Sequence, residues 1–519
     1  MSLKAEVNQM LSGVARLCDD CEDGHLLKDV LTEMTQRLSQ PLRVAVSGIM
    51  KAGKSTFMNA LMGEKLVYTG VKEATYTVCW FKYAAKPYIK ICFKDGEELE
   101  TEYTELEKWS VRESEKDNPR INDVKYLVIY YPNEILKQME FIDTPGLNAV
   151  YGKDSQNTLD FLAVKQSEET IKETSMADAV IYAFQRSAGS FDEEILKSFQ
   201  EGNNTSPINS VGILTRVDSG GIWDIYGGST PVEAAGDVVE SIMKNQLMKQ
   251  SVFSCFPVCA KPVEGFDDLT IEDWEVLKKL SKLSKSEIED VLFDASEFIC
   301  DSAGFLADYG DEATRKHILD SVDRYAVVEI CSQLAENIDA EKSQIKDVLV
   351  DKCGISAVRN MLMSHFGNRT FLIKTQFIFS RLRKLAAEIR NNENSSRRLV
   401  ELCSNLDSRI DEMMTNIQTL NELRILQYYY NGQLSFTDDD EREDFLQVTG
   451  EYGREPENRL GISTSATMSE LMNVAKKKAE KWHGKAGQFM MTNTYVDAAT
   501  TIARSYEYML YHLSALCDE

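Results

Sequence analysis

The second half of this 519-residue chain is almost free of proline, since nine of the ten prolines lie at or before Pro262 and only Pro456 follows. Proline lacks a backbone N–H and clashes with the preceding helical turn, so about 250 residues nearly without it should be mostly helical. The sequence also lacks an apolar run of about 18 residues, which predicts that it has no transmembrane helix. Its start lacks the basic and apolar regions of a signal peptide, so a cytoplasmic location is expected.

Positive charge is scarce, and the formal net charge is −25. Extensive contact with nucleic acid is therefore excluded, because binding to phosphates needs a basic surface. Any contact with a membrane would be peripheral, local and largely apolar. The cysteine count of 11 is odd and the spacing is loose, which fits a reducing compartment better than a disulfide framework. Cys18 and Cys21 lie near His25 but lack a fourth ligand, so packing explains them better than a metal site does.

The segment from Gly48 to Ser55 matches GxxxxGK[ST], the pattern of a phosphate-binding loop. A β-prone apolar segment, 42–47, precedes it, and a helix-forming segment, 56–62, follows. Lys54 is expected to reach the β- and γ-phosphates of a nucleoside triphosphate and Ser55 to ligate Mg²⁺. Residues of the loop and the first helical turn are predicted to bind the nucleotide: Gly48, Lys51, Ala52, Gly53, Lys54, Ser55 and Thr56.

A second motif follows a short apolar strand at 139–142. Asp143 stands at the end of that strand and begins the sequence Asp-Thr-Pro-Gly. A carboxylate there can hold a water on Mg²⁺, and the N–H of Gly146 can sense the γ-phosphate. Taken alone, the motif would also fit an ordinary turn.

A third motif, Thr215-Arg216-Val217-Asp218, resembles the [NT]KxD signature of GTPases with arginine in the lysine position. Asp218 can accept hydrogen bonds from N1–H and N2–H₂ of guanine, a donor pair that adenine lacks, so GTP or GDP is the expected ligand. The aliphatic stem of Arg216 can cover the base. By itself the motif also fits an aspartate that caps a helix. The segment 256–261 resembles the last base-binding loop, with Ala260 and Lys261 at the base.

Hydrolysis is the least determined part of the site. Thr75 is the preferred switch threonine that closes on Mg²⁺, with Thr77 as its rival and a β-strand as the plain alternative. Leu147 stands where Ras-like GTPases carry a water-positioning glutamine, so another group must supply that function or hydrolysis is slow. Lys51 can neutralise charge between the β- and γ-phosphates, in particular after dimerisation. The alternative for Lys51 is a solvated lysine on an exposed loop.

The expected fold is an α/β P-loop GTPase domain followed by a mostly α-helical stalk or bundle. An N-terminal helical segment at 1–40 precedes the GTPase domain at 41–263, and helices of a neck and stalk fill 264–519. A polar break at 391–396 is where two long helices can turn back on each other. Residues 433–464, with an acidic stretch at 437–444, are expected to be disordered. A helical stretch from 467 to 516, interrupted near Gly484 and Gly487, closes the chain.

The whole chain resembles bacterial dynamin-like proteins, a branch of the dynamin superfamily of large GTPases. The resemblance rests on Gly53-Lys54-Ser55-Thr56 with Asn59-Ala60-Leu61, on Tyr68-Thr69-Gly70-Val71, and more loosely on the helical stretches 315–320 and 354–369. It implies a GTPase head on a helical stalk, with the N-terminal helix packed on the C-terminal one as a neck. It also implies a homodimer or larger assembly through the nucleotide face, mutual activation of hydrolysis, and remodelling or tethering of membranes.

Two segments are candidates for contact with lipid. The first, 371–379, is apolar and flanked by basic residues, but a buried helix explains it better. The second is a row of lysines for which a solvated helix face is the better explanation: Lys476, Lys477, Lys478, Lys481 and Lys485. A different class of function is a soluble GTPase switch whose helical half binds a protein partner and has no direct action on membranes.

Overall fold

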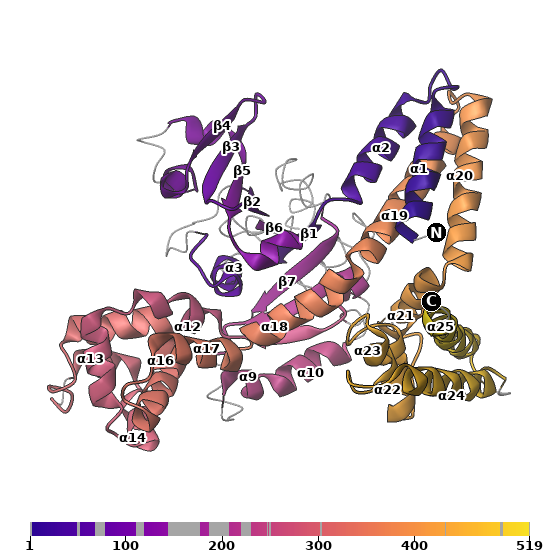
Figure 1. The fold of residues 1–519 in the computed structure, drawn as a ribbon. Helices are drawn as coiled ribbons and strands as arrows, with labels where there is room; N and C mark the ends of the chain where they lie inside the picture. The colour runs from indigo at the N-terminus through magenta and orange to yellow at the C-terminus, as the bar shows by residue number, and fades with distance from the viewer. Residues whose placement is uncertain are drawn as a thin grey trace.

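The computed structural model describes the following parts of the chain: residues 3–48, 52–67, 78–110, 119–143, 177–185, 207–218, 230–245, 248, 251–301, 304–430, 432–487 and 491–517. Within these parts, strands β1 to β9 form one mixed sheet at the centre, surrounded by helices (Figure 1). The sheet and the helices nearest to it, which we call the head, carry the nucleotide motifs.

The order of strands in the sheet is β4-β3-β5-β2-β6-β1-β7-β8-β9. β6, β1, β7, β8 and β9 are parallel neighbours, so their carboxyl ends meet at one edge. The strands are β1 (Leu42–Gly48), β2 (Val78–Tyr83), β3 (Tyr88–Phe93), β4 (Glu98–Glu102), β5 (Val124–Tyr131), β6 (Met139–Asp143), β7 (Ala179–Gln185), β8 (Ser210–Thr215) and β9 (Cys255–Val258).

The parallel strands are buried on both faces, which explains their continuous apolar sequences. Val44, Ala45 and Val46 of β1 are fully buried, as are Ile213 and Leu214 of β8. Short helices of the head are α3 (Lys54–Met62), η1 (Tyr103–Glu105), α4 (Leu106–Ser110), η3 (Pro119–Asp123), η4 (Glu134–Lys137), η5 (Pro207–Asn209), α9 (Pro231–Ala234), α10 (Gly236–Lys244) and α12 (Ala260–Glu264).

A long helical path crosses the head and leaves it. It consists of α18 (Ile355–Met361), the π-helical turn η7 (Leu362–Gly367) and α19 (Asn368–Asn391). Val358, Leu362 and Phe366 belong to the same apolar core as the sheet. The helical half of the chain is therefore anchored in the head by its own buried side chains.

A second group of helices, residues 266–352, forms what we call the helical lobe. It contains η6 (Phe266–Asp268), α13 (Ile271–Leu280), α14 (Lys285–Val291), α15 (Ala295–Cys300), α16 (Glu312–Glu336) and α17 (Lys342–Lys352). The lobe has an apolar core of its own, in which Leu277, Phe298 and Ile330 are fully buried. It lies at one end of the sheet, beside α12 (Figure 1).

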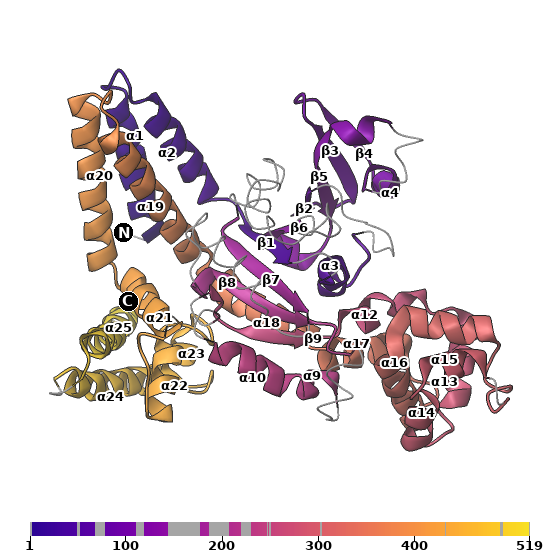
Figure 2. The ribbon, with the colours of Figure 1, turned by 180° about the vertical axis from the view of Figure 1, so that it is seen from behind.

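A third group is a bundle at the other end of the molecule, as Figure 2 shows from behind. It joins α1 (Leu3–Cys18) and α2 (His25–Arg37) to α19 and α20 (Arg397–Asn416), around a separate core. α19 and α20 turn back on each other at the polar break, which confirms that prediction. In this structure α1 and α2 have α19 and α20 as packing partners, whereas the last helix, α25 (Asn493–Cys517), packs on α24 and α21.

The apolar segment 371–379 lies within α19, where Ile373, Phe377, Ile378 and Phe379 are buried. The prediction of a buried helix is thus confirmed: Phe371 and Leu372 are partly buried, and no apolar side chain of the segment is fully exposed. Among the described helices, none is both long and apolar enough to cross a bilayer.

The prediction of disorder at 433–464 is wrong. This part of the chain contains α22 (Asp439–Val448) and α23 (Pro456–Leu460), between α21 (Gln418–Tyr430) and α24 (Met468–Ala486). Phe445, Val448 and Leu460 are buried in the core. The acidic residues of α22 pair with the lysine row of α24: Asp444 lies 2.9 Å from Lys478 and 2.6 Å from Lys481, and Glu441 pairs with Lys485.

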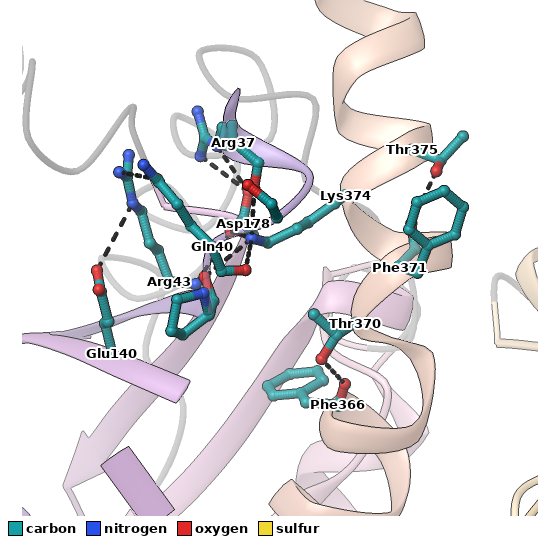
Figure 3. A network of polar contacts seen from close by, with 12 residues as sticks. Arg37, Gln40, Arg43, Glu140, Asp178, Phe366, Thr370, Phe371, Lys374 and Thr375 are labelled. Atoms are coloured by element: carbon teal, nitrogen blue, oxygen red, sulfur yellow. Dashed lines mark hydrogen bonds and ion pairs between the residues drawn. The ribbon is translucent and has the colours of Figure 1, made fainter. Parts of the chain in front are cut away.

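A buried ion cluster joins the bundle to the head (Figure 3). The carboxylate of Asp178, just before β7, accepts from Arg37 Nε and from the backbone N–H of Arg43, each at 3.0 Å. Nζ of Lys374 on α19 donates to the carbonyl groups of Arg37, the last residue of α2, and of Gln40 and Pro41, which lead into β1. Burial lowers the pKa of Lys374 to about 8, against the opposing effect of Asp178. Elements from distant parts of the sequence therefore share one desolvated junction.

Candidate nucleotide site

The phosphate loop begins where β1 ends and closes where α3 begins. Gly48 has φ +147°, and a β-carbon there would lie 2.5 Å from the carbonyl oxygen of Ala183 on β7. Gly53 has φ +80° directly before the first turn of α3, which carries Ser55 and Thr56. Both positions favour glycine, since other residues rarely adopt such backbone angles. The α3 N-terminus consequently points its free N–H groups at the loop, where an anion can bind.

Lys54 lies inside this loop and is only 7% exposed. Its Nζ donates to the carbonyl oxygen of Gly48 at 3.1 Å. Burial lowers the pKa of Lys54, and the carboxylate of Asp143 acts in the opposite direction. A buried ammonium in a loop of backbone amides is suited to bind phosphate oxygens.

Asp143 at the end of β6 is fully buried next to Ser55. The Ser55 hydroxyl donates to Oδ2 of Asp143 at 3.3 Å, while Oδ1 has no hydrogen-bond partner among the described residues. Burial raises the pKa of Asp143 to about 6, although Lys54 and Ser55 lower it. A buried carboxylate with a free oxygen beside a hydroxyl fits the oxygen ligands that Mg²⁺ prefers.

Thr215 at the end of β8 contacts the phosphate loop directly. Its Oγ1 lies 2.6 Å from the carbonyl oxygen of Ala52 and 2.8 Å from that of Phe184. The hydroxyl therefore ties β8 and β7 to the loop, a positioning role that the sequence motif did not reveal. The next residue, Arg216, has φ +57° and an exposed side chain near Gly53.

Asp218 is 7% exposed, and burial raises its pKa to about 6. Asp323 adds to this rise, whereas Lys261 and Arg216 oppose it. Ala260 is buried at the start of α12, next to Lys261. The structure thus brings the third motif and the predicted last base-binding loop together at the edge that carries the phosphate loop.

One charged neighbour of this site, Asp323 of α16, is absent from the sequence-based prediction. Its carboxylate lies 3.8 Å from Nζ of Lys261, which also donates to the carbonyl oxygen of Leu319 at 3.2 Å. No sequence motif marks Asp323, because it stands inside a helical stretch far from the nucleotide motifs. Only the packing of the helical lobe on α12 reveals it.

Several predicted residues lie outside the described part of the chain: Lys51, Thr75, Thr77, Gly146 and Leu147. Their roles in closing on Mg²⁺ and in hydrolysis remain predictions from the sequence.

Comparison with known proteins agrees with the geometry of the loop. Residues 44–217 match the sequence model of the Dynamin family. The isoniazid-induced protein IniC of Mycobacterium tuberculosis is 24% identical over 494 residues, 93% of this chain and 93% of that protein. A bacterial dynamin-like protein of Nostoc punctiforme is 33% identical over 149 residues, 26% of this chain and 21% of that protein. A solved chain of an oligomerised bacterial dynamin pair covers 98% of this chain and 91% of its own length, at 13% identity and a TM-score of 0.34. The family match over residues 44–217 and the phosphate-loop head together identify this part of the chain as a dynamin-type GTPase domain, so the chain is an enzyme that hydrolyses GTP.

Proposed function

We propose that the edge of the sheet at the carboxyl ends of β1, β6 and β8 binds GTP with Mg²⁺. The observation that supports this most strongly is the convergence of three buried charged groups, Lys54, Asp143 and Asp218, on that edge. Lys54 and the N-terminus of α3 would bind the phosphates, and Asp218 would accept hydrogen bonds from guanine. Ser55 and Asp143 would hold Mg²⁺, which, when bound, offsets charge on the β- and γ-phosphates.

We further propose that hydrolysis needs a second copy of the chain. Leu147 cannot orient a water, so a single head lacks one element of catalysis. In this proposal Lys51 offsets charge in the phosphate loop once two heads meet through their nucleotide faces. Thr75 would supply a hydroxyl ligand to Mg²⁺, and the N–H of Gly146 would sense the γ-phosphate.

The proposed action on membranes depends on the helical parts. Residues 41–263 would be the GTPase domain, 1–40 with helices of the C-terminal half would form the neck, and the rest of 264–519 the stalk. Support comes from the buried cluster around Asp178, through which a movement of the head would act on α2 and α19. GTP-driven dimerisation would then move the bundle and remodel or tether a membrane.

A soluble switch that binds a protein partner is the second candidate. Two observations favour it: the apolar segment of α19 is buried, and three lysines of α24 are paired with acidic groups of α22. The apolar segment and three of the five lysines that the sequence offered for lipid contact are therefore engaged within the chain, while Lys476 and Lys477 are exposed.

Sedimentation with vesicles separates the two candidates. The full chain is mixed with phosphatidylcholine vesicles or with vesicles that also contain phosphatidylglycerol, each with GTP, GDP or no nucleotide. We expect more protein in the pellet with GTP, and no such increase for Lys54→Ala, whose phosphate loop lacks its ammonium. If GTP increases pelleting on neither type of vesicle, the membrane function is wrong and the soluble switch is the better proposal.

A further inference from the structure

The base-binding end of the head is held by residues of the helical half. A β-carbon at Gly265, at the end of α12, would lie 2.0 Å from the backbone oxygen of Ser321 on α16, so these two elements touch without a side chain between them. The N–H of Cys259 donates to the carbonyl oxygen of Cys353, at the end of α17, at 3.0 Å. Cys259 directly precedes the predicted base contacts Ala260 and Lys261, which begin α12, so the helical half bears directly on the segment that would bind guanine.

The contact coincides with an unusual conformation in α16. Asp323 interrupts this helix with φ 70° and ψ 167°, in a region of backbone space that is essentially confined to glycine. Strained residues of this kind cluster at functional sites, where surrounding contacts hold them in place. Here the kink places the Asp323 carboxylate 3.8 Å from Nζ of Lys261. The side chain of Asp323 is 33% exposed and that of Lys261 is 41% exposed.

A purely structural role for Asp323 must be weighed against this. Its Oδ1 accepts from the backbone N–H of Arg324 at 2.7 Å, where the second half of the helix begins. An asparagine could make the same hydrogen bond and is the residue other than glycine that best tolerates positive φ. The negative charge is therefore not needed for the kink, but it is needed to attract Lys261.

We propose that Asp323 is a positioning residue for guanine recognition, which holds Lys261 at the base-binding loop across the contact between the head and the helical lobe. This inference rests on the proposed role of Asp218 as the guanine-binding carboxylate. With Asp323 in place, Lys261 is fixed between the carboxylate of Asp323 and the carbonyl of Leu319, and its stem is ordered before the base arrives. Such preorganisation reduces the entropy lost on binding.

The charges around Asp218 provide a readout that a purely structural role would not affect. The groups that face it are Asp323, Lys261 and Arg216. Asp323 raises the pKa of Asp218 and the two cations lower it. Removing the charge of Asp323 should therefore lower the pKa of Asp218, so that guanine binding is lost only at a lower pH than in the wild type.

The test is GDP affinity between about pH 5 and pH 8 for Asp323→Asn, Lys261→Met and the double variant. We expect Asp323→Asn to weaken GDP about two- to fivefold at pH 7.5, the range for a partly exposed ion pair. The pH at which GDP affinity begins to fall in acid should also be lower for this variant than for the wild type. If Asp323 acts through Lys261, the double variant should bind no more weakly than Lys261→Met alone. Asp320→Asn, which removes the same charge from an exposed site on α16, should change neither quantity.

Two further variants separate folding and the base assignment from this inference. Asp323→Gly relieves the backbone conformation, so it should be at least as stable as the wild type yet lose the same GDP affinity. Asp218→Asn should lose GDP affinity and gain affinity for xanthosine diphosphate, because its amide can donate to the 2-oxygen of xanthine. If Asp218→Asn binds GDP normally, the proposed base site is wrong and this inference with it. If Asp218→Asn behaves as expected but Asp323→Asn matches the wild type, or the effects of the double variant add, only the role of Asp323 is overturned.

Discussion

At the scale of single residues, the site is built from charges that are costly to bury. Asp143 is fully buried and Asp218 nearly so, and both carboxyl groups have a pKa of about 6. The folded, nucleotide-free protein thus binds a proton at Asp218 between about pH 4 and 6 that the unfolded chain releases. Ionisation of this residue therefore lowers stability as the pH rises through that window. A ligand that donates hydrogen bonds to the ionised carboxylate offsets this loss of stability.

Guanine binding should accordingly fall in acid. We expect the affinity for GDP without added Mg²⁺ to decrease below a pH of about 6, by up to about tenfold per pH unit, because the protonated acid loses its acceptor pair. The measurement is a fluorescence titration of GDP against pH. The phosphate of GDP titrates in the same range, so the readout is the difference in slope between the wild type and Asp218→Asn. Equal slopes would show that Asp218 does not bind the base in its ionised form.

Local motifs predicted most residues of the candidate site, and the structure explains why Asp323 was not among them. Gly48, Lys54 and Asp143 lie at fixed places in strand-loop-helix units, so their spacing along the chain carries their position in space. Asp323 reaches the site only because α16 kinks and the lobe packs on α12. The role of Thr215 as a tie between β8 and the phosphate loop likewise depends on tertiary contacts.

At the scale of elements, the buried cluster of Asp178 should be decisive for how α2 and α19 dock on the sheet. Arg37 is 2% exposed, and Asp178 and Lys374 are fully buried, so removing the carboxylate takes away a negative charge that neutralises two buried cations. We expect Asp178→Ala to lower the free energy of unfolding by roughly 3–5 kcal/mol. Urea denaturation measures this difference, provided that the free energy of unfolding depends on urea concentration with the same slope in both proteins.

Asp19→Ala is the matched control for that experiment. Asp19 pairs with Lys28 on the surface, with 57% and 41% of the side chains exposed. Loss of such an exposed pair, which solvent screens, should leave the free energy of unfolding nearly unchanged. If Asp178→Ala costs no more than Asp19→Ala, the junction does not hold the bundle on the head.

Helical periodicity and the scarcity of proline predicted the α-helical half and its turn at 391–396. They did not predict that α22 and α23 are ordered. Composition alone made 433–464 look disordered, because its carboxylates had no visible partners. The partners are Lys478, Lys481 and Lys485 on α24. Whether an acidic segment is ordered therefore depends on the basic residues that pack against it, and these are known only from the tertiary structure.

At the scale of the whole molecule, the described helices divide into parts with different cores. The lobe of α13–α17 and the bundle of α1, α2, α19 and α20 each have their own, while buried residues of α21–α25 join the core of the head. The helical lobe lies at the end of the sheet beside α12, where base binding is proposed, and the bundle lies at the opposite end (Figures 1 and 2). We therefore expect a change at the candidate nucleotide site to act on the helical parts at two places, through α16 and through the Asp178 junction.

The central claim is that this GTPase works as a pair of heads. The most direct test is the rate of GTP hydrolysis per molecule over a wide range of protein concentration, with Mg²⁺ and saturating GTP. We predict that the rate per molecule rises with concentration and then levels off, because a single head with Leu147 in place of a glutamine is incomplete. A rate per molecule that stays constant over the whole range would contradict the account, since each head would then act alone.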